Sequence, residues 1–263
     1  MMLTLVILGL TIAVFSADGA ARLALSQDRD GRIFGGRNAT IEEYPYQVAI
    51  FYGGFICGGS IIDAKHVLTA AHCVPDELFV KYLTVRAGSS FKDYGGSLHH
   101  VEAAIKHENF TFNASNDPVY DVAVLKLNES VRFDKSRQRI ELFESGEPVL
   151  AGSKASISGW GKTAQGIPAQ LQVVEVPVIT RELCDYAYRN RGGIDDGQIC
   201  AALYGQGEKD ACAGDSGGPL AIDGRLAGIV SYGQGCAESR FPGVYADVSY
   251  FRSWIDFAVD QLS

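Results

Sequence analysis

The residues with the clearest chemical meaning lie in one segment, residues 209–220, which reads KDACAGDSGGPL. Ser216 stands near its centre, among glycines and other small residues. Glycine allows the backbone to approach a ligand closely, so the segment can present the serine hydroxyl and leave backbone N–H groups pointing at a substrate. A nucleophile beside an oxyanion site has these requirements. Taken alone, the motif fits a solvated serine in a glycine-rich hairpin equally well.

Two further residues provide the groups that would activate such a serine. His72 lies in TAAHC within an apolar, strand-like run, and Asp121 begins DVAVLKL, where a buried carboxylate is costly unless it is paired. Each alone also fits a structural role, as a packed histidine and as a turn or cap residue. With Ser216 they follow the order His, Asp, Ser, one of the known orders of a catalytic triad.

The order and spacing of the motifs resemble those of trypsin-like serine proteases of the chymotrypsin fold. The resemblance runs from about Arg32 to the C-terminus and is carried by IFGG, TAAHC, DVAVLKL, SGWG, GDSGGP and PGVY. It implies that Ser216 attacks the scissile carbonyl, that His72 transfers the proton, and that Asp121 orients His72. It also implies an oxyanion hole formed by the backbone N–H groups of Gly214 and Ser216.

The same resemblance implies a substrate-binding pocket that accepts a cation. Asp210 matches the carboxylate at the floor of the pocket, and Gly233 and Gly243 match wall positions where a side chain would block a long substrate residue. A planar guanidinium gives a carboxylate two hydrogen bonds, so we expect cleavage after Arg and Lys. The alternative for Asp210 is a solvated loop charge, which the two glycines make less plausible.

Resemblance to the same family adds expectations for four positions near the pocket. Ser231 matches a serine that hydrogen-bonds the buried aspartate, and Tyr232 stands where the family usually has Trp, which would reshape the cleft. Ala211 lacks the hydroxyl of many trypsins, which favours Arg over Lys. Ala213 replaces a longer residue, which would leave the rim of the pocket more open.

The resemblance further implies that the protein is made as a zymogen. Cleavage after Arg32 would free the amine of Ile33, which would turn inward, pair with Asp215 and order the pocket. A buried charge that lacks its partner destabilises by roughly 3–5 kcal/mol, so we expect the uncut chain to be nearly inactive. The alternative is that Arg32 lies in an ordinary exposed linker.

The N-terminal segment predicts secretion. Residues 1–16 are apolar and uncharged, too short to span a bilayer comfortably, and small residues suited to cleavage follow, so the signal segment would end at 16 or at 20. A membrane anchor is the alternative. Residues 17–32 would be the activation propeptide and residues 33–263 the peptidase domain. N-x-S/T sequons agree with secretion, at Asn38, Asn109, Asn113 and Asn128.

Six cysteines in a secreted chain predict three disulfides, although sequence alone leaves the pairing open. Zinc ligation is the alternative, but the chain contains no CxxC pair. The family resemblance implies the pairs Cys57–Cys73, Cys184–Cys200 and Cys212–Cys236.

Short apolar runs separated by turn signals begin at Tyr46 and are typical of a β-sandwich or β-barrel. Only residues 250–262 show helical spacing. The resemblance makes the fold class all-β, with two packed antiparallel Greek-key β-barrels and a C-terminal α-helix. A change in composition around residue 144 divides the first barrel (33–144) from the second barrel and helix (145–263).

The net charge of −8 argues against nucleic acid or a membrane surface as a partner, because both require a basic patch. We expect polypeptide substrates, an activating protease that could be the enzyme itself, protein protease inhibitors, and a monomer. No cofactor and no metal are expected. The stretch after Arg86 holds one carboxylate before Val101, Asp93, too few for calcium. His99 and His100 indicate a solvated face.

These observations predict a secreted serine endopeptidase, most like invertebrate trypsins, that works through an acyl-enzyme. The short propeptide favours a digestive role, and a venom or haemolymph-cascade protease is the alternative. A serine protease homologue that acts only as a binding module is a different class of function. Such homologues typically lose a residue of the triad, and His72, Asp121 and Ser216 are all present here.

Overall fold

The computed structural model describes residues 35–207 and 209–263, all of which belong to the same unit of the fold. The predicted signal segment and propeptide lie outside the described residues, and so do Arg32 and Ile33.

Six strands form a closed antiparallel barrel in the order β2-β3-β4-β9-β6-β5. Buried apolar side chains from these strands fill the interior of the barrel. The strands are β2 (Gln47–Tyr52), β3 (Gly54–Ile61), β4 (His66–Thr69), β5 (Thr84–Ala87), β6 (Ser97–Lys106) and β9 (Ala123–Leu127). The predicted first barrel is confirmed.

An eight-stranded sheet, most of which comes from residues after 145, has the strand order β1-β12-β11-β14-β15-β16-β13, with β10 pairing in parallel to β15. One bridge, between Val178, which follows β12, and Ala201 of β13, connects the second strand of this order with the last. The structure therefore shows a second large, mostly antiparallel sheet, and its closure into a second barrel stays a prediction. Its strands are β1 (Arg37–Asn38), β10 (Glu141–Leu142), β11 (Lys154–Gly159), β12 (Gln172–Pro177), β13 (Gln198–Ala201), β14 (Pro219–Ile222), β15 (Arg225–Tyr232) and β16 (Gly243–Asp247).

Two of these strands come from the first half of the sequence. β1 pairs with β12, and β10 pairs with β15, although both precede residue 145. The expected division at residue 144 therefore does not separate the two sheets, because the first and last strands of residues 33–144 pair with strands of the second sheet.

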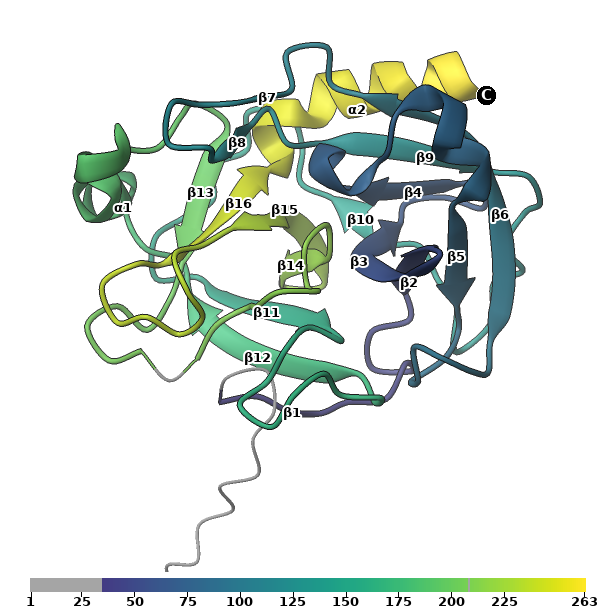
Figure 1. The fold of residues 1–263 in the computed structure, drawn as a ribbon, viewed down its shortest axis with the longest axis horizontal. Helices are drawn as coiled ribbons and strands as arrows, with labels where there is room; N and C mark the ends of the chain where they lie inside the picture. The colour runs from purple at the N-terminus through teal and green to yellow at the C-terminus, as the bar shows by residue number, and fades with distance from the viewer. Residues whose placement is uncertain (1–34, 208) are drawn as a thin grey trace, which may run out of the picture. The chain divides into compact units, whose positions relative to one another are not determined.

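The predicted C-terminal helix is confirmed as α2 (Val248–Leu262). Asp247 caps it by accepting hydrogen bonds from the N–H groups of Ser249 and Tyr250. Its apolar side joins the core of the barrel. The helix therefore follows the second sheet in the sequence but packs against the barrel (Figure 1). Neither α-helix in the described part of the chain is long and apolar enough to cross a bilayer.

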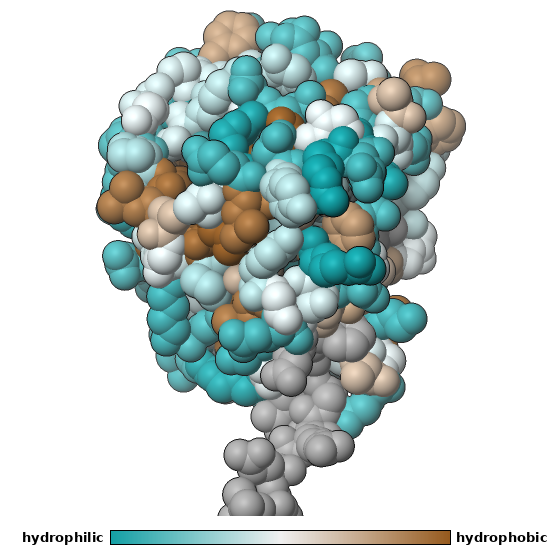
Figure 2. All heavy atoms as spheres, turned by 90° about the vertical axis from the view of Figure 1, so that its left-hand side faces the viewer, coloured by the Kyte–Doolittle hydropathy of each residue, from teal (hydrophilic) through white to brown (hydrophobic). Residues whose placement is uncertain are grey.

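The structure also contains a short α-helix, α1 (Arg181–Tyr188), that was not predicted. It has only eight residues and begins at Thr180, whose side chain accepts from the N–H of Leu183. Half of its residues are exposed, and its apolar repeat is too short to stand out in the sequence. The face that carries α1 is largely hydrophilic, with apolar residues gathered in a few places (Figure 2).

The remaining elements are short. They are the 3₁₀-helices η1 (Ala71–Cys73), η2 (Glu77–Tyr82) and η3 (Arg189–Arg191), and the two-stranded pair β7 (Thr111–Phe112) and β8 (Pro118–Val119).

Small and polar residues make part of the contact between the barrel and the second sheet, beside an apolar cluster that includes Ala49 of β2 and Val173 of β12. The hydroxyl of Ser158 on β11 donates to the side-chain oxygen of Gln47 on β2 at 2.6 Å, and both residues are buried. A Cβ on Gly58 of β3 would lie 3.0 Å from the Cα of Gly218, so glycine is needed for this close approach.

All six cysteines form the three disulfides that the resemblance implied, Cys57–Cys73, Cys184–Cys200 and Cys212–Cys236. They close loops with sequence separations of 16, 16 and 24 residues. In the chain-entropy description, a disulfide that closes a loop of this size stabilises the folded state by about 3 kcal/mol.

Candidate active site

A buried carboxylate holds the imidazole of His72. Asp121, which is 2% exposed, lies between β8 and β9, and its Oδ2 is 2.7 Å from Nδ1 of His72. Its Oδ1 accepts from the backbone N–H of His72 at 2.9 Å, and its Oδ2 also accepts from the hydroxyl of Ser231 at 2.6 Å. Because the carboxylate oxygen accepts, Nδ1 carries the proton and Nε2 is left free to accept one. His72 belongs to η1 of the barrel, whereas Ser231 belongs to β15 of the second sheet.

The backbone that presents Asp121 is strained at the preceding residue. Tyr120 has φ of +54°, a left-handed conformation that non-glycine residues rarely adopt. Its ring packs against the ring of His107, with centroids 4.9 Å apart, and His107 in turn stacks on Trp254 of α2. These aromatic contacts hold the strained residue in place, and they link α2 to the carboxylate.

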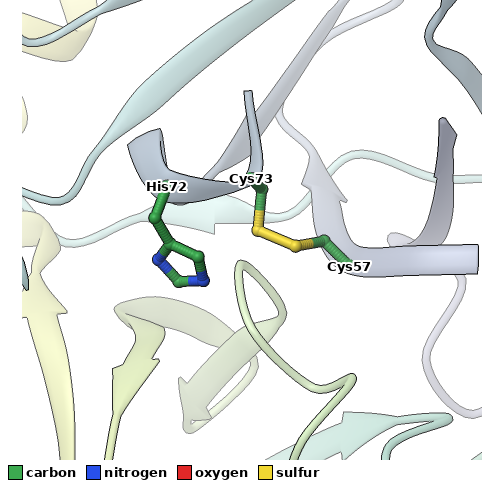
Figure 3. A group of neighbouring side chains, drawn as sticks. All are labelled: Cys57, His72 and Cys73. Carbon is green, nitrogen blue, oxygen red and sulfur yellow. A yellow bond between two sulfur atoms is a disulfide. The ribbon is translucent and has the colours of Figure 1, made fainter. Parts of the chain in front are cut away.

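The loop that carries Ser216 is fixed between the barrel and the second sheet. The carbonyl of Ser216 accepts from the N–H of Gly58 on β3, and the N–H of Gly217 donates to the carbonyl of Val230 on β15, both at 2.8 Å. A Cβ on Gly217 would lie 2.1 Å from the Oγ1 of Thr69, so the loop requires glycine here. Gly58 follows Cys57 in the chain, and Figure 3 shows the disulfide of Cys57 beside the imidazole of His72.

Asp121 therefore bonds both His72 of the barrel and Ser231 of the second sheet, and Ser231 lines the same cavity as Ser216. This place, where the barrel and the second sheet meet, is called the cleft here. The N–H groups of Gly214 and Ser216 donate no hydrogen bond to any acceptor in residues 35–207 and 209–263. Gly214 has φ of +101°, which only glycine adopts readily. Two free donors beside a serine hydroxyl can stabilise an oxyanion.

A cavity of about 260 Å³ opens beside Ser216 and ends at a buried carboxylate. Asp210, 6% exposed, lines it together with Ala211, Ala213 and Gly233. Its Oδ2 accepts from the N–H of Ala237 at 3.0 Å, and burial raises the pKa of Asp210 to about 7. A cation that enters the cavity would offset this desolvation and would restore the charge of the carboxylate.

The two glycines of the pocket differ in their surroundings. A Cβ on Gly243 would lie 3.0 Å from Oδ1 of Asp210 and 2.8 Å from the hydroxyl of Tyr245, so no side chain fits there without displacing them. A Cβ on Gly233 would meet only ordinary contacts at 3.7 Å and beyond. A side chain at Gly233 would therefore be tolerated by the fold and would occupy cavity volume.

Tyr245 is a pocket residue that the sequence analysis missed. It is fully buried, its hydroxyl has no partner among the described residues, and it lines the cavity next to Asp210. A buried hydroxyl without a partner is costly, so it favours a polar ligand in the cavity. The only signal was the motif PGVY, in which Tyr245 is the last residue and which served to establish the resemblance.

A second buried carboxylate lies under the loop. Asp215 is completely buried and accepts from the N–H groups of Gly161 at 2.8 Å and Cys212 at 3.0 Å. Cβ atoms on Gly159 or Gly161 would lie 2.1 Å and 2.3 Å from its oxygens, which explains both glycines of SGWG. Burial raises the pKa of Asp215 to about 6. None of the ion pairs within the described ranges includes Asp215, and its expected partner, Ile33, lies outside them.

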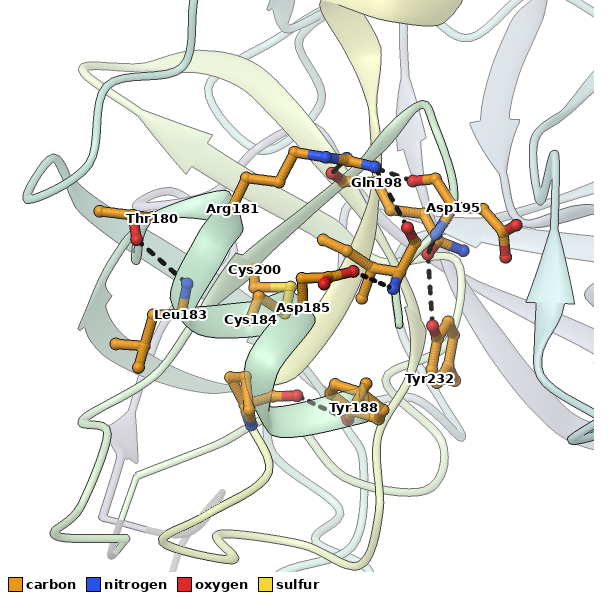
Figure 4. The surroundings of a disulfide bond; sticks show 12 residues. Thr180, Arg181, Leu183, Cys184, Asp185, Tyr188, Asp195, Gln198, Cys200 and Tyr232 are labelled. Carbon is orange, nitrogen blue, oxygen red and sulfur yellow. Dashed lines mark hydrogen bonds between the residues drawn. A yellow bond between two sulfur atoms is a disulfide. The ribbon is translucent and has the colours of Figure 1, made fainter. Parts of the chain in front are cut away.

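Gln198 is another residue that sequence reasoning missed. Its side-chain oxygen accepts from the N–H of Asp195 at 2.9 Å and from the hydroxyl of Tyr232 at 3.3 Å (Figure 4). Its amide nitrogen donates to the carbonyl of Pro118 on β8 at 3.1 Å. Gln198 is buried, and it ties Tyr232 in the cleft to the segment that leads to Asp121.

Replacing Gln198 by leucine should lower the free energy of unfolding by about 2 kcal/mol, because buried groups of the three partners lose their hydrogen bonds. Tyr232→Phe removes only the long bond and should cost less than about 1 kcal/mol. Guanidinium unfolding of both variants in a Ser216→Ala background, which prevents self-cleavage, measures the difference. Equal losses in the two variants would contradict a linking role for Gln198.

The same region contains an ion pair between η3 and the segment before β8. The guanidinium of Arg191 bonds both carboxylate oxygens of Asp117, at 2.7 and 2.9 Å, and also the carbonyl of Ser115. Asp117 precedes Asp121 by four residues, so this pair and Gln198 together anchor the loop before the triad carboxylate.

The described residues offer one cluster with metal-ligating atoms, Cys57, His72 and Cys73, whose ligand atoms lie within 4.8 Å of one another. Both cysteines are consumed in a disulfide, so no thiolate is present to hold a metal. The expectation of a solvated face is wrong for His99, which is buried and bonds to the hydroxyl of Ser97 at 2.8 Å, because its strand turns this side chain inward. His100 is exposed, and the carboxylate of Asp93 pairs with Lys92.

The four sequons lie at the surface to different degrees. Asn38, Asn109 and Asn128 are exposed. Asn113 is half-buried, and its side-chain oxygen accepts from the N–H groups of Ser115 and Asp117. Glycosylation at these positions stays a prediction.

Comparison with known proteins finds a matching protein family and similar proteins from several flies. The family model described as Trypsin matches residues 33–255. Trypsin alpha of Drosophila erecta is 42% identical over 259 residues, covering 97% of each chain. Trypsin of Simulium vittatum is 42% identical over 251 residues, covering 92% of this chain and 99% of the relative. Hypodermin-B of Hypoderma lineatum is 43% identical over 236 residues, covering 86% and 87%.

Proposed function

This chain belongs to the trypsin family of serine proteases, and from that membership we propose that it is a secreted endopeptidase, made as a zymogen, that cleaves polypeptides after Arg and Lys. That it is a serine endopeptidase acting on polypeptides follows from the family itself. The specificity, the activation and the residue roles are the proposal.

The proposed reaction starts at the hydroxyl of Ser216, which attacks the scissile carbonyl while Nε2 of His72 takes its proton. Asp121 holds His72 in the required tautomer and stabilises the imidazolium. The N–H groups of Gly214 and Ser216 bind the developing oxyanion. His72 then donates its proton to the leaving amine, which leaves an acyl-enzyme. A water molecule takes the place of the amine, His72 removes its proton, and attack of this water releases the acyl group from Ser216.

The observation that carries the proposed specificity is the buried carboxylate of Asp210 at the end of the cavity beside Ser216. A guanidinium or ammonium group would pair with it, and glycine at Gly243 keeps the carboxylate accessible. The unpaired hydroxyl of Tyr245 supports a polar occupant as well.

Activation is proposed to occur by cleavage after Arg32, which frees the amine of Ile33 to pair with Asp215. The buried carboxylate of Asp215 supports this, because none of the described cations pairs with it. The proposed biological role is digestive, with a venom or haemolymph-cascade protease as the alternative.

The proposal is tested by profiling the activated protein against a library of peptides. Cleavage after Arg and Lys is expected, and cleavage spread evenly over other residues would contradict the specificity. Asp210→Ser should lower kcat/KM for Arg and Lys substrates about 30- to 1,000-fold, since it removes one partner of a buried charge pair. Asp223→Ser, in the exposed turn between β14 and β15, is the matched control and should leave kcat/KM unchanged.

A further inference from the structure

A group of exposed aromatic side chains lies beside the cleft on the barrel. It consists of Tyr52 at the end of β2 and of Phe79 and Tyr82 in η2, which are 40%, 43% and 57% exposed, and is called the aromatic patch here. The ring centroids of Tyr52 and Phe79 are 6.5 Å apart, and those of Phe79 and Tyr82 are 6.4 Å apart. Phe79 and Tyr82 are three residues apart, and in a 3₁₀-helix this spacing places them on the same side. Contiguous exposed apolar groups of this kind mark binding surfaces.

Both chain segments of the aromatic patch continue directly into the cleft. Tyr52 pairs with Gly54 at the tip of the β2–β3 hairpin, and the next residue, Phe55, lies 3.2 Å from the position of a Cβ on Gly214. Further along the same strand, Gly58 bonds the carbonyl of Ser216. On the other side, η2 begins four residues after Cys73, which follows His72.

The distance between the patch and the cleft suits a peptide. Phe51 pairs with Phe55 and Tyr52 pairs with Gly54 across the hairpin, so Tyr52 lies one strand step, about 3.3 Å, beyond Phe55. The rings of Phe79 and Tyr82 follow at centroid spacings of 6.5 and 6.4 Å. A Cβ built on Gly54 would meet no atom within 4 Å, which leaves the strand open between Phe55 and the patch. An extended substrate advances about 3.3 Å per residue, so about five of its residues would pass from the level of Phe55 to the far end of the patch.

The side of the cleft identifies which part of the substrate reaches the patch. The cavity that ends at Asp210 is built by the second sheet and its loops, and it receives the residue before the scissile bond. The barrel wall, with β3 and the Cys57–Cys73 disulfide, lies on the other side of Ser216. The leaving part of the polypeptide therefore runs along the barrel.

We propose that the aromatic patch is a specificity determinant that binds apolar or aromatic side chains about three to five residues after the scissile bond. This inference rests on the proposed function, since it takes Ser216 as the nucleophile and the Asp210 cavity as the site of the preceding residue. The patch gives the enzyme a second point of selection, on protein substrates only, because short substrates end before they reach it.

The test compares three substrates: an arginine amide with a small leaving group, a peptide with Phe and Leu at the third to fifth positions after the arginine, and the same peptide with Ser there. The wild-type enzyme should cleave the apolar peptide about five- to tenfold better than the serine peptide, through a lower KM. The double variant Phe79→Ser/Tyr82→Ser should lose this preference and should keep wild-type kcat/KM on the arginine amide.

Phe257→Ser is the matched control, because Phe257 is equally exposed, at 57%, on α2. It should leave all three values unchanged. Equal cleavage of the two peptides by the wild-type enzyme would overturn the proposal, as would an equal loss of the double variant on all three substrates. Dimers of the wild type that the double variant abolishes, seen by sedimentation, would assign the patch to a second copy and would also overturn it. Failure to cleave the arginine amide would instead refute the proposed function.

Discussion

Replacing Ser216 by alanine is expected to lower kcat about 10⁶-fold, the loss typical of a protease deprived of its nucleophile. The variant keeps the free N–H groups of Gly214 and of residue 216, so binding and oxyanion stabilisation remain, and activity should stay about 10³- to 10⁴-fold above that of water. The side chain of Ser216 has no hydrogen bond within the described residues, so its loss should leave the fold intact.

The measurement is the initial rate on an arginine amide after removal of the activating protease, together with labelling by an active-site-directed serine reagent. Wild type should be labelled once per chain and the variant not at all. Ser145→Ala is the matched control, because Ser145 is an exposed serine that contacts Ser253 and lies outside the cleft. A Ser216→Ala variant within tenfold of the wild-type rate would refute the assignment of the nucleophile.

Replacing Arg32 by glutamine is expected to abolish activation. Treatment with a protease specific for Arg and Lys would then leave the Ile33 amine in a peptide bond, and Asp215 would stay without its partner. The cost of a buried unpaired charge corresponds to an activity about 10²- to 10³-fold below that of the activated enzyme. The measurement is activity on an arginine amide with N-terminal sequencing of the treated chain. Full activity without a new terminus at Ile33 would refute the switch.

The same switch predicts how stability changes with pH. Burial raises the pKa of Asp215 to about 6, whereas in the unfolded chain it returns to about 3.9. The folded uncut chain therefore holds a proton that the unfolded chain releases, so its stability is greatest below about pH 4 and falls as the pH rises through about 6, by roughly 3 kcal/mol.

Pairing with the Ile33 amine would favour the charged carboxylate and would remove this loss. We expect guanidinium unfolding between pH 4 and 8 to show a fall in stability that is larger, by roughly 3 kcal/mol, in the uncut Ser216→Ala protein than in the cut one. Asp215→Asn should bring the pH dependence of the uncut form to that of the cut form. The raised pKa of Asp210 acts in the same direction in both forms, so the difference between the two curves is the informative quantity.

Much of the fold and of the site could be read from the sequence because the informative residues lie in contiguous motifs. The segments around His72, Asp121 and Ser216 each combine a reactive residue with glycines or an apolar strand, and their order on the chain is distinctive. The structure brings these three segments to one cleft, although only the segments, and not their contacts, were visible beforehand.

The parts that could not be predicted depend on contacts between distant segments. Gln198 looks like any polar strand residue, and its role exists only because Pro118 and Tyr232 lie on either side of it in space. The burial of His99 likewise follows from the strand on which it lies. The pairing of β1 with β12 also cannot be seen in a two-residue strand, because such a strand has no periodicity of its own.

The three disulfides each lie within one half of the protein, and the described contacts between the halves are noncovalent. His72 and Asp121 belong to the barrel half, whereas Ser216 and Ser231 belong to the half that forms the second sheet, so no disulfide joins the base to the nucleophile across the contact between the halves. A small movement of the two halves apart would separate His72 from Ser216, while the strands within each disulfide-linked half stayed paired. On heating, enzymatic activity should therefore be lost several degrees before the circular dichroism of the β-structure changes, and on cooling it should return as long as the halves have not been cut apart.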